Sequence, residues 1–361
     1  MNEVPVSQDA PQDLEQDVTP SNIFIPPTVD TPKLLSGNTY SYFSPIPSAI
    51  ASDLSTECVI GIDEAGRGPV LGPMVYSLFY VPQSLHYSLL RDTHAFTDSK
   101  ALTAEVRSNL MRTLCTPPAT SAGAESNDAD DAADAGEAES ASLQTHCGFS
   151  ATLLSATSIS SYMLPSPRTA PYNLNAQAMD ATIDLIQRTY DMGLNITDIF
   201  VDTIGKPEVY QKNLERIFPA ARISVEKKAD VTYPVVGAAS VVAKVTRDVA
   251  LEVLWDEYVK HTSMTDPGDH WGSGYPSDGR ATNWLKASMD PIFGWGSECR
   301  FSWGTAKDLL EGKSAAAIVD YEEEDSKTVK MTDFFSSNGE DDGAEDELGR
   351  WYGRNLSEEV F

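Results

Sequence analysis

Residues 59–69 read VIGIDEAGRGP, an apolar run that places two adjacent carboxylates, Asp63 and Glu64, before a glycine-flanked arginine. The run predicts a short strand, and successive side chains of a strand point to opposite faces. Asp63 and Glu64 therefore cannot both face one site while the chain stays extended. The small residues that follow let the backbone turn and approach a ligand closely. Carboxylates at a strand end beside a basic loop suit an oxygen-ligated cation and a phosphate. The alternative is a polar strand-to-turn transition with a solvated Asp-Glu pair.

Patterns further along the chain predict an α/β fold. Apolar and β-branched runs predict strands at about 57–63, 74–81, 149–158, 197–202 and 222–226. Helical spacing and turn residues predict helices that begin after Thr103, after 172–175 and after 205–207, and helices over about 231–260, 280–289 and 305–312. Consecutive strands, then strand-helix alternation, then helices favour a mixed five-stranded sheet flanked by helices, with a C-terminal helical extension.

The net charge argues at first against a nucleic-acid partner, because the 361 residues carry a formal charge of −28. Its distribution weakens that objection. Three segments together hold 28 of the 54 acidic residues but only 5 of the 26 basic ones, namely 1–55, 120–140 and 318–361. The rest of the chain is close to balanced, so an anionic substrate is not excluded.

The same composition predicts where the chain folds. Segments rich in Pro, Ser, Ala, Asp and Glu cannot bury a core, and they predict a disordered leader over 1–52, an acidic disordered insert over 119–142 and a disordered acidic tail over 313–361. Residues 53–312 are then the folded domain. The 4 cysteines are widely spaced and indicate reduced, mostly buried thiols. The sequence shows no membrane span, no signal peptide and no clear basic targeting cluster.

Two further segments end on acids. Asp202 closes an apolar strand and Asp230 precedes the long helix. Ligands of open sheets gather where strands end, so these acids could converge with Asp63 and Glu64. Hard oxygen ligands select Mg²⁺ or Mn²⁺, and clustered carboxylates repel one another without cations. Two cations about 3.5–4 Å apart would remove that repulsion, activate a water and stabilise a leaving oxygen. Alternatively, Asp230 is a helix N-cap and Asp202 ends its strand in an Asx-turn.

The motifs resemble those of the type 2 ribonuclease H family, also called ribonuclease HII. The segment DEAGRGP at 63–69 is similar to the family signature, and VDT at 201–203 and KAD at 228–230 are similar to its other acidic motifs, in the same order. The likeness covers about 57–310 apart from the acidic insert. It implies a ribonuclease H-like fold. It also implies catalytic and metal-binding roles, with two Mg²⁺ or Mn²⁺ ions expected, for Asp63, Glu64, Asp202 and Asp230.

The resemblance implies a metal-dependent endoribonuclease. Its substrates would be RNA in RNA–DNA hybrids and single ribonucleotides embedded in duplex DNA. It would cut on the 5′ side of the ribonucleotide and leave 3′-hydroxyl and 5′-phosphate ends. The implied roles are ribonucleotide removal from DNA, a form of DNA repair, and RNA primer removal in DNA replication. The alternative is a non-catalytic protein that binds RNA–DNA hybrids, although the presence of all four carboxylates argues against it.

Substrate contacts are also implied. Gly66, Arg67 and Gly68 are similar to the family loop that senses the 2′-hydroxyl through backbone atoms, and this hydroxyl is what distinguishes RNA from DNA. Tyr275 lies in a Gly-Tyr-Pro segment whose tyrosine, in the family, contacts the 2′-hydroxyl and packs on the next sugar; the alternative is a turn tyrosine packed on Trp271. Phosphate positioning, or else a surface charge or cap, is expected of Lys100, Asn173, Lys244, Arg247 and Thr305.

The partner predictions come from resemblance as well. The acidic tails and C-terminal helices look like the catalytic subunit of the eukaryotic enzyme of this family, which implies two non-catalytic accessory subunits in a heterotrimer and a nuclear location. In the tail, Met331, Phe334 and Phe335 resemble a sliding-clamp-binding motif in which Thr328 replaces the usual leading glutamine. The competing interpretation is that this apolar cluster docks on the accessory subunits.

Overall fold

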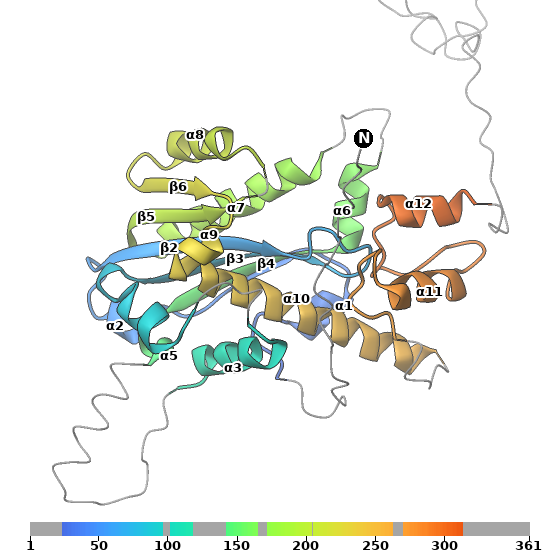
Figure 1. Ribbon diagram of the computed structural model, residues 1–361, viewed down its shortest axis with the longest axis horizontal. Coiled ribbons are helices and arrows are strands. Elements are labelled where there is room, and N and C mark those ends of the chain that lie inside the picture. The colour runs from blue at the N-terminus through green and yellow to red at the C-terminus, as the bar shows by residue number, and fades with distance from the viewer. Residues whose placement is uncertain are drawn as a thin grey trace, which may run out of the picture. The chain divides into compact units, whose positions relative to one another are not determined.

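A mixed sheet with strand order β1-β4-β3-β2-β5-β6 forms the centre of the protein (Figure 1). The computed structural model describes residues 24–96, 102–117, 142–164, 172–203, 205–262 and 270–312. Its strands are β1 (Tyr40–Phe43), β2 (Glu57–Ala65), β3 (Met74–Pro82), β4 (Gly148–Leu154), β5 (Asn195–Asp202) and β6 (Arg222–Glu226). The first four pair antiparallel, whereas β5 runs parallel to β2 and β6 runs parallel to β5.

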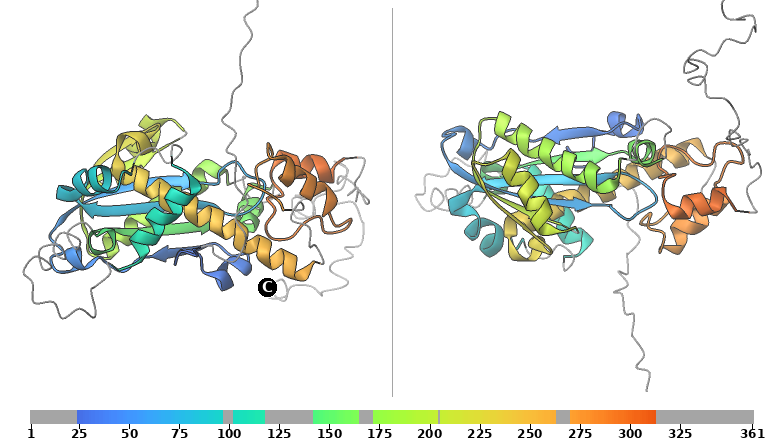
Figure 2. Two further views of the ribbon diagram at one scale, coloured as in Figure 1. Left: turned by 60° about the horizontal axis from the view of Figure 1, so that its bottom comes forward. Right: turned by 90° about the horizontal axis from the view of Figure 1, so that it is seen from above.

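Helices cover both faces of the sheet. The helices of the described residues, including those beside the sheet, are α1 (Thr31–Leu35), α2 (Ser48–Ala51), η2 (Gln83–Leu85), η3 (Ser88–Thr93), α3 (Ala104–Cys115), α5 (Leu143–His146), α6 (Ala156–Met163), α7 (Leu174–Asp191), α8 (Pro207–Ile217), α9 (Ala229–Thr232), α10 (Pro234–His261), α11 (Gly279–Ala287) and α12 (Gly304–Leu310). Figure 2 shows α3 and α10 against one face and α7 and α8 against the other. None of the helices in the described ranges is long and apolar enough to cross a membrane.

Side-chain alternation along the central strands builds the two cores. On β2, Ile60 and Ile62 face the α7 side, whereas Val59 faces the α10 side. The strand follows the predicted alternation because its backbone is extended, and both of its faces are apolar because helices cover both. Gly61 allows α10 to cross β2 closely, since a Cβ atom there would lie 2.4 Å from the Val235 carbonyl. This close approach packs the start of α10 directly on β2, whereas α9, just before it, contacts β5.

The structure confirms the predicted α/β class and mixed sheet but corrects its size. The sheet has six strands instead of five, because Tyr40–Phe43 pairs with β4 at its edge. The leader predicted over 1–52 is therefore wrong for 24–52, where short elements pack through the buried Val29, Leu34 and Ile50. Elements of four or five residues are too short to show a period, which is why composition alone suggested disorder. Residues 1–23 lie outside the described part.

Other boundaries also shift. The strand expected at 149–158 ends at Leu154, and Ser155 then caps α6 by accepting the Ser158 N–H. The helix expected over 231–260 is two helices, α9 and α10, separated at Tyr233. Nearly all of the predicted insert, and the whole tail over 313–361, lie outside the described residues.

The C-terminal segment packs as a third core beside the end of the sheet. Trp271, Trp284 and Trp295 are buried there, together with Leu71 and Cys299, which form an antiparallel bridge between distant parts of the chain. The predicted helical extension is thus present as α11 and α12. It lies against the loop that follows β2.

Candidate active site

Two of the predicted acids lie side by side at the carboxyl ends of parallel strands. Ile62 of β2 is opposite Val201 of β5, so the next residues, Asp63 and Asp202, are neighbours across the strands. Asp63 is only 5% exposed. β2 stays extended to Ala65, so Glu64 points to the opposite face from Asp63, as the alternation predicts.

A tight turn places Asp230 directly after the residue that is hydrogen-bonded to Asp202. Lys228 adopts a left-handed conformation with φ 61°, which bends the chain after β6 and starts α9. Asp230 lies in the first turn of that helix and is 3% exposed. The N-cap position belongs to Lys228, so the N-cap interpretation of Asp230 is wrong. Asp202 accepts the Ala229 N–H at 3.0 Å, and this bond ties the end of β5 to α9 instead of closing an Asx-turn.

Burial, and to a lesser extent repulsion between the acids, disfavours the charged forms of Asp63 and Glu64. Burial raises the pKa of Asp63 well above its usual value, and the charges of Glu64 and Asp202 raise it further, although a hydrogen bond with Ser240 opposes them. Burial raises the pKa of Glu64 to about 7; Asp202 adds to the rise and Arg67 opposes it. Because each charge disfavours the next, a bound cation would favour the ionised form of all of them.

The donor set fits a hard divalent cation. It consists of carboxylate oxygens at strand and helix ends, the ligand type that Mg²⁺ and Mn²⁺ prefer. Within the ranges that the structure describes, no three His, Cys, Asp or Glu side chains are already gathered closely enough to hold a metal ion. Side-chain rotations would therefore have to accompany binding, consistent with carboxylates that repel one another when no cation neutralises them.

The loop after β2 approaches its neighbours very closely. Gly66 has φ +77°, and a Cβ atom there would lie 2.9 Å from the Pro73 carbonyl oxygen. A Cβ atom on the exposed Gly68 would lie 3.2 Å from the ring of Tyr275. The glycine loop and the Gly-Tyr-Pro segment, which are far apart in the sequence, thus face each other.

Two residues that sequence reasoning missed hold the carbonyl groups of this loop. Arg300 is 0% exposed and donates to the carbonyl oxygens of Gly66 at 2.7 Å, Arg67 at 3.2 Å and Gly72 at 3.0 Å. Trp303 donates its indole N–H to the Gly68 carbonyl at 2.9 Å. The sequence pattern that could have indicated a buried Arg300 is its position between Cys299 and Phe301, in a segment rich in tryptophan.

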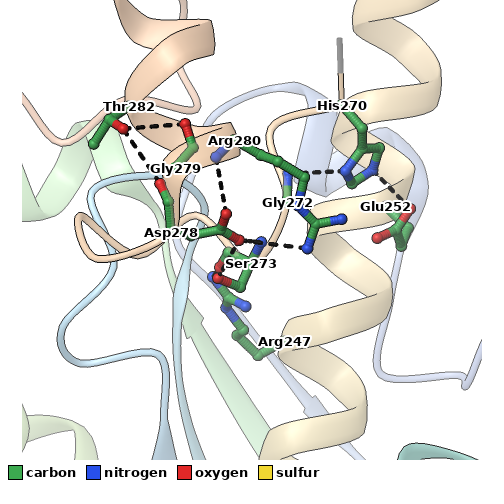
Figure 3. A network of polar contacts seen from close by, with 9 residues as sticks. All are labelled: Arg247, Glu252, His270, Gly272, Ser273, Asp278, Gly279, Arg280 and Thr282. Carbon is green, nitrogen blue, oxygen red and sulfur yellow. Dashed lines mark hydrogen bonds and ion pairs between the residues drawn. The ribbon is translucent and has the colours of Figure 1, made fainter. Parts of the chain in front are cut away.

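The predicted phosphate contact of Arg247 is not compatible with its position. Its side chain is 2% exposed, and one guanidinium nitrogen donates to the Ser273 carbonyl at 2.6 Å (Figure 3). The guanidinium also lies 5.7 Å from the centroid of the Tyr275 ring. The Arg247 guanidinium therefore points into the protein, where it contacts the Tyr275 ring and the Ser273 carbonyl. Tyr275 contacts Gly68 and Arg247, whereas Trp271 packs against other aromatic rings.

The remaining predicted positions are spread around this centre. Asn173 is the N-cap of α7 and accepts the N–H groups of Asn175 and Ala176, so its side chain has the cap role that was the alternative. Its neighbour Asn175, which was not predicted, accepts a hydrogen bond from Arg67. Lys244 is 37% exposed and pairs with Asp248 at 3.5 Å. Thr305 is half-buried in the first turn of α12. Outside the described residues lie Lys100, Met331, Phe334 and Phe335.

Comparisons with known proteins agree with these features. The profile of the family described as Ribonuclease HII matches residues 60–306. The chain is 51% identical over 339 residues to a ribonuclease H2 subunit of Neurospora crassa, covering 94% of this chain and 97% of that one. It is 38% identical over 301 residues to the corresponding ribonuclease H2 subunit of Homo sapiens, covering 82% and 87%. The crystal structure of ribonuclease H2 from Pyrococcus horikoshii OT3 superimposes with a TM-score of 0.50 at 25% identity, covering 70% and 97%.

Proposed function

The chain belongs to the ribonuclease HII family and is an endoribonuclease of the ribonuclease H2 type; from this premise we propose its substrates and mechanism. It hydrolyses RNA within RNA–DNA hybrids and at single ribonucleotides embedded in duplex DNA. It cuts on the 5′ side of the ribonucleotide and leaves 3′-hydroxyl and 5′-phosphate ends. The observation that carries this proposal is that Asp63 and Asp202 are neighbours at the ends of parallel strands, with Asp202 bonded to the residue before Asp230, and that the glycine loop faces Tyr275.

In this proposal Asp63, Glu64, Asp202 and Asp230 are the catalytic carboxylates and hold two Mg²⁺ or Mn²⁺ ions. Such ions supply a water of lowered pKa and positive charge for the leaving oxygen. The carboxylates orient the ions from different elements: β2 contributes two of them, β5 one and α9 one. The hydrogen bond from Ala229 keeps Asp202 directed toward α9, so the spacing of the ligands follows from the packing of α9 on the sheet.

The glycine loop and Tyr275 recognise the sugar of the ribonucleotide. Gly66, Arg67 and Gly68 present peptide groups to the 2′-hydroxyl, and Tyr275 contacts the same hydroxyl and packs on the following deoxyribose. The short distance between Gly68 and Tyr275 supports one site that binds both sugars, because a Cβ atom on Gly68 would lie 3.2 Å from the Tyr275 ring. Arg67, held by Asn175, lies near Glu64 and would approach the scissile phosphate.

Phosphate contacts away from the cut position the duplex without reading its sequence. We assign this role to Lys100, Lys244 and Thr305. Arg247 is excluded from direct contact by its burial and acts on Tyr275 instead.

The relatives named as subunits of ribonuclease H2 support a proposal about assembly. The chain is the catalytic member of a heterotrimer with two non-catalytic accessory subunits, and it acts in the nucleus in DNA replication and repair. Met331, Phe334 and Phe335 bind a sliding clamp. A pull-down with Phe334→Ala and Phe335→Ala combined tests that contact, and undiminished clamp binding would remove the motif from consideration.

A labelled DNA duplex with one ribonucleotide tests the catalytic proposal. The assembled complex is incubated with Mg²⁺ and carries either the wild-type chain, Asp63→Asn or the control Asp191→Asn. Asp191 is exposed at the end of α7, about 24 Å along that helix from Asn175. We expect one cut 5′ to the ribonucleotide, lost only in Asp63→Asn. If the wild-type complex binds the duplex tightly but never cuts it, the enzyme proposal is wrong and the hybrid-binding alternative holds.

A further inference from the structure

The segment that carries Tyr275 is closed into a loop by one carboxylate. Residues 270–278 lie between α10 and α11, with Gly272 at φ +59° and Gly274 at φ +74° (Figure 3). Asp278 stands at the end of this loop, at the N-cap position of α11. The side chain that ends the loop therefore also begins the next helix.

Asp278 binds both sides of Tyr275. Its Oδ2 atom accepts the Ser273 N–H at 2.8 Å and the Ser273 hydroxyl at 2.9 Å. Its own N–H donates to the Tyr275 carbonyl at 2.9 Å. Its Oδ1 atom accepts the Arg280 N–H at 2.9 Å and so caps α11. The tripeptide Ser273-Gly274-Tyr275 is thus held at both ends by one residue.

The same loop is fixed to the rest of the site from the other side. The Ser273 carbonyl accepts from Arg247 at 2.6 Å, and the Gly274 carbonyl accepts the N–H groups of Val70 at 2.9 Å and Leu71 at 3.3 Å. The second contact joins the tyrosine loop directly to the segment that continues from the glycine loop. A change in the position of Ser273 would therefore move Tyr275 relative to Gly68.

The Asp278 side chain is 17% exposed, and close neighbours restrict the position of its carboxylate. A Cβ atom on Gly272 would lie 2.3 Å from the Asp278 Oδ2 atom, so no side chain other than hydrogen fits there. The Gly272 N–H donates to His270 Nδ1 at 2.9 Å, and His270 Nε2 lies 3.2 Å from Glu252 of α10. The hydrogen bond from Gly272 shows that Nδ1 carries no proton, so Nε2 is the donor to Glu252.

We propose that Asp278 is a positioning residue that sets the distance between the Tyr275 ring and the glycine loop, and thereby the selectivity for a ribonucleotide followed by deoxyribose. The inference rests on the proposed function, in which Tyr275 reads that junction. Asp278 itself touches no reacting group. It acts through Ser273 and the Tyr275 backbone, and one of its side-chain oxygens accepts two hydrogen bonds from Ser273.

The test compares Asp278→Ser with wild type in the assembled complex. Serine still caps α11 but is too short to hold Ser273 as well, so helix stability is largely kept. We measure kcat and KM on a duplex with one ribonucleotide and on a continuous RNA–DNA hybrid. The ratio of the two kcat/KM values should shift at least about tenfold against the single ribonucleotide; this is less than the full worth of two hydrogen bonds to a charged acceptor, because the loop keeps its bonds to Arg247 and Val70. Ser273→Ala, which removes one of the two, should shift the ratio in the same direction by less.

A double-mutant comparison separates positioning from general damage. In a Tyr275→Ala background, Asp278→Ser should cause no further change in the ratio, because the tyrosine through which it acts is absent. The matched control is Asp290→Asn, since Asp290 also accepts two backbone N–H groups but only within its own turn, from Ile292 and Phe293. It should leave the ratio unchanged.

The outcomes distinguish this inference from the proposed function. If the wild-type complex does not cut the single ribonucleotide, or Tyr275→Ala leaves the ratio unchanged, the proposed reading of the junction fails. If Tyr275→Ala changes the ratio while Asp278→Ser and Ser273→Ala do not, the proposed function stands and the role of Asp278 is overturned. An equal effect of Asp278→Ser with and without Tyr275 also overturns it.

Discussion

Replacing Arg300 with lysine should loosen the glycine loop without removing a positive charge. Arg300 is fully buried and donates to three carbonyl groups, those of Gly66, Arg67 and Gly72. Burial, together with the nearby charge of Arg247, lowers its pKa to about 9, so the group stays protonated at neutral pH. A lysine ammonium is a compact point charge and cannot reproduce the planar fork that reaches three separated oxygens.

The structure sets the size of the effect. Lysine can retain one of the three bonds, so about two buried carbonyl groups lose their donor. Each buried group left unsatisfied costs roughly 1–3 kcal/mol, so the loss of two should lower the free energy of unfolding by about 2–6 kcal/mol. At about 2–4 °C per kcal/mol for a domain of this size, the melting temperature should fall by about 4–24 °C. Trp303→Phe removes a single hydrogen bond, from the indole to the Gly68 carbonyl, and should cost about 1 kcal/mol.

The assay combines urea unfolding with cleavage of the single-ribonucleotide duplex below the melting transition. The control is Arg188→Lys, whose side chain is 47% exposed and forms an i,i+4 pair with Asp184, so it should cost less than about 1 kcal/mol. We expect Arg300→Lys to lower kcat/KM even where the chain is fully folded. A variant with unchanged stability and unchanged cleavage would refute the idea that Arg300 holds the loop.

Three further predictions concern other parts of the chain. Gly61→Ala should destabilise the fold by about 1–3 kcal/mol and reduce cleavage, because its Cβ atom would lie 2.4 Å from the Val235 backbone and push α10 from β2; unchanged urea unfolding would contradict this. His86 is buried and accepts the Val235 N–H, and burial lowers its pKa to about 4 from 6.5. Because the folded pKa is depressed, its contribution is present above about pH 6.5 and is lost as pH falls toward 4, so stability should drop by about 2 kcal/mol between pH 7 and pH 5. Urea unfolding of His86→Gln at both pH values should lack that drop; an equal drop would assign it to other groups. Deleting residues 120–140 should leave kcat nearly unchanged, because that acidic, low-complexity stretch is not expected to reach the chemistry; a collapse of activity would place it in the site.

Local sequence patterns predicted an element correctly wherever that element is long and apolar enough to show its period. β2 and β3 were predicted within two residues of their observed ends, and the motif around Asp63 lies at the end of β2, as predicted. The alternation of Asp63 and Glu64 could also be predicted, because it depends only on extended backbone. These features come from residues close together in the chain.

The long-range supports of the site could not be predicted in this way. Arg300 meets Arg67 across 233 residues, and Arg247 meets Ser273 across 26 residues, from a different segment of the fold. The prediction that Arg247 binds phosphate failed for the same reason. The sequence gives the charge of an arginine but not whether its side chain is exposed or buried. Burial is a property of the packed chain.

The sequence by itself determined the α/β class, the order of the acidic motifs and the glycine loop, because each depends on residues that are close together in the chain. Only the tertiary structure decided that residues 40–43 add a sixth strand, that Asp230 lies inside a helix turn, and that Arg300 and Asp278 hold the glycine loop and the Tyr275 loop. The physical reason is that isolated short strands and buried polar groups are stable only once distant partners satisfy their hydrogen bonds.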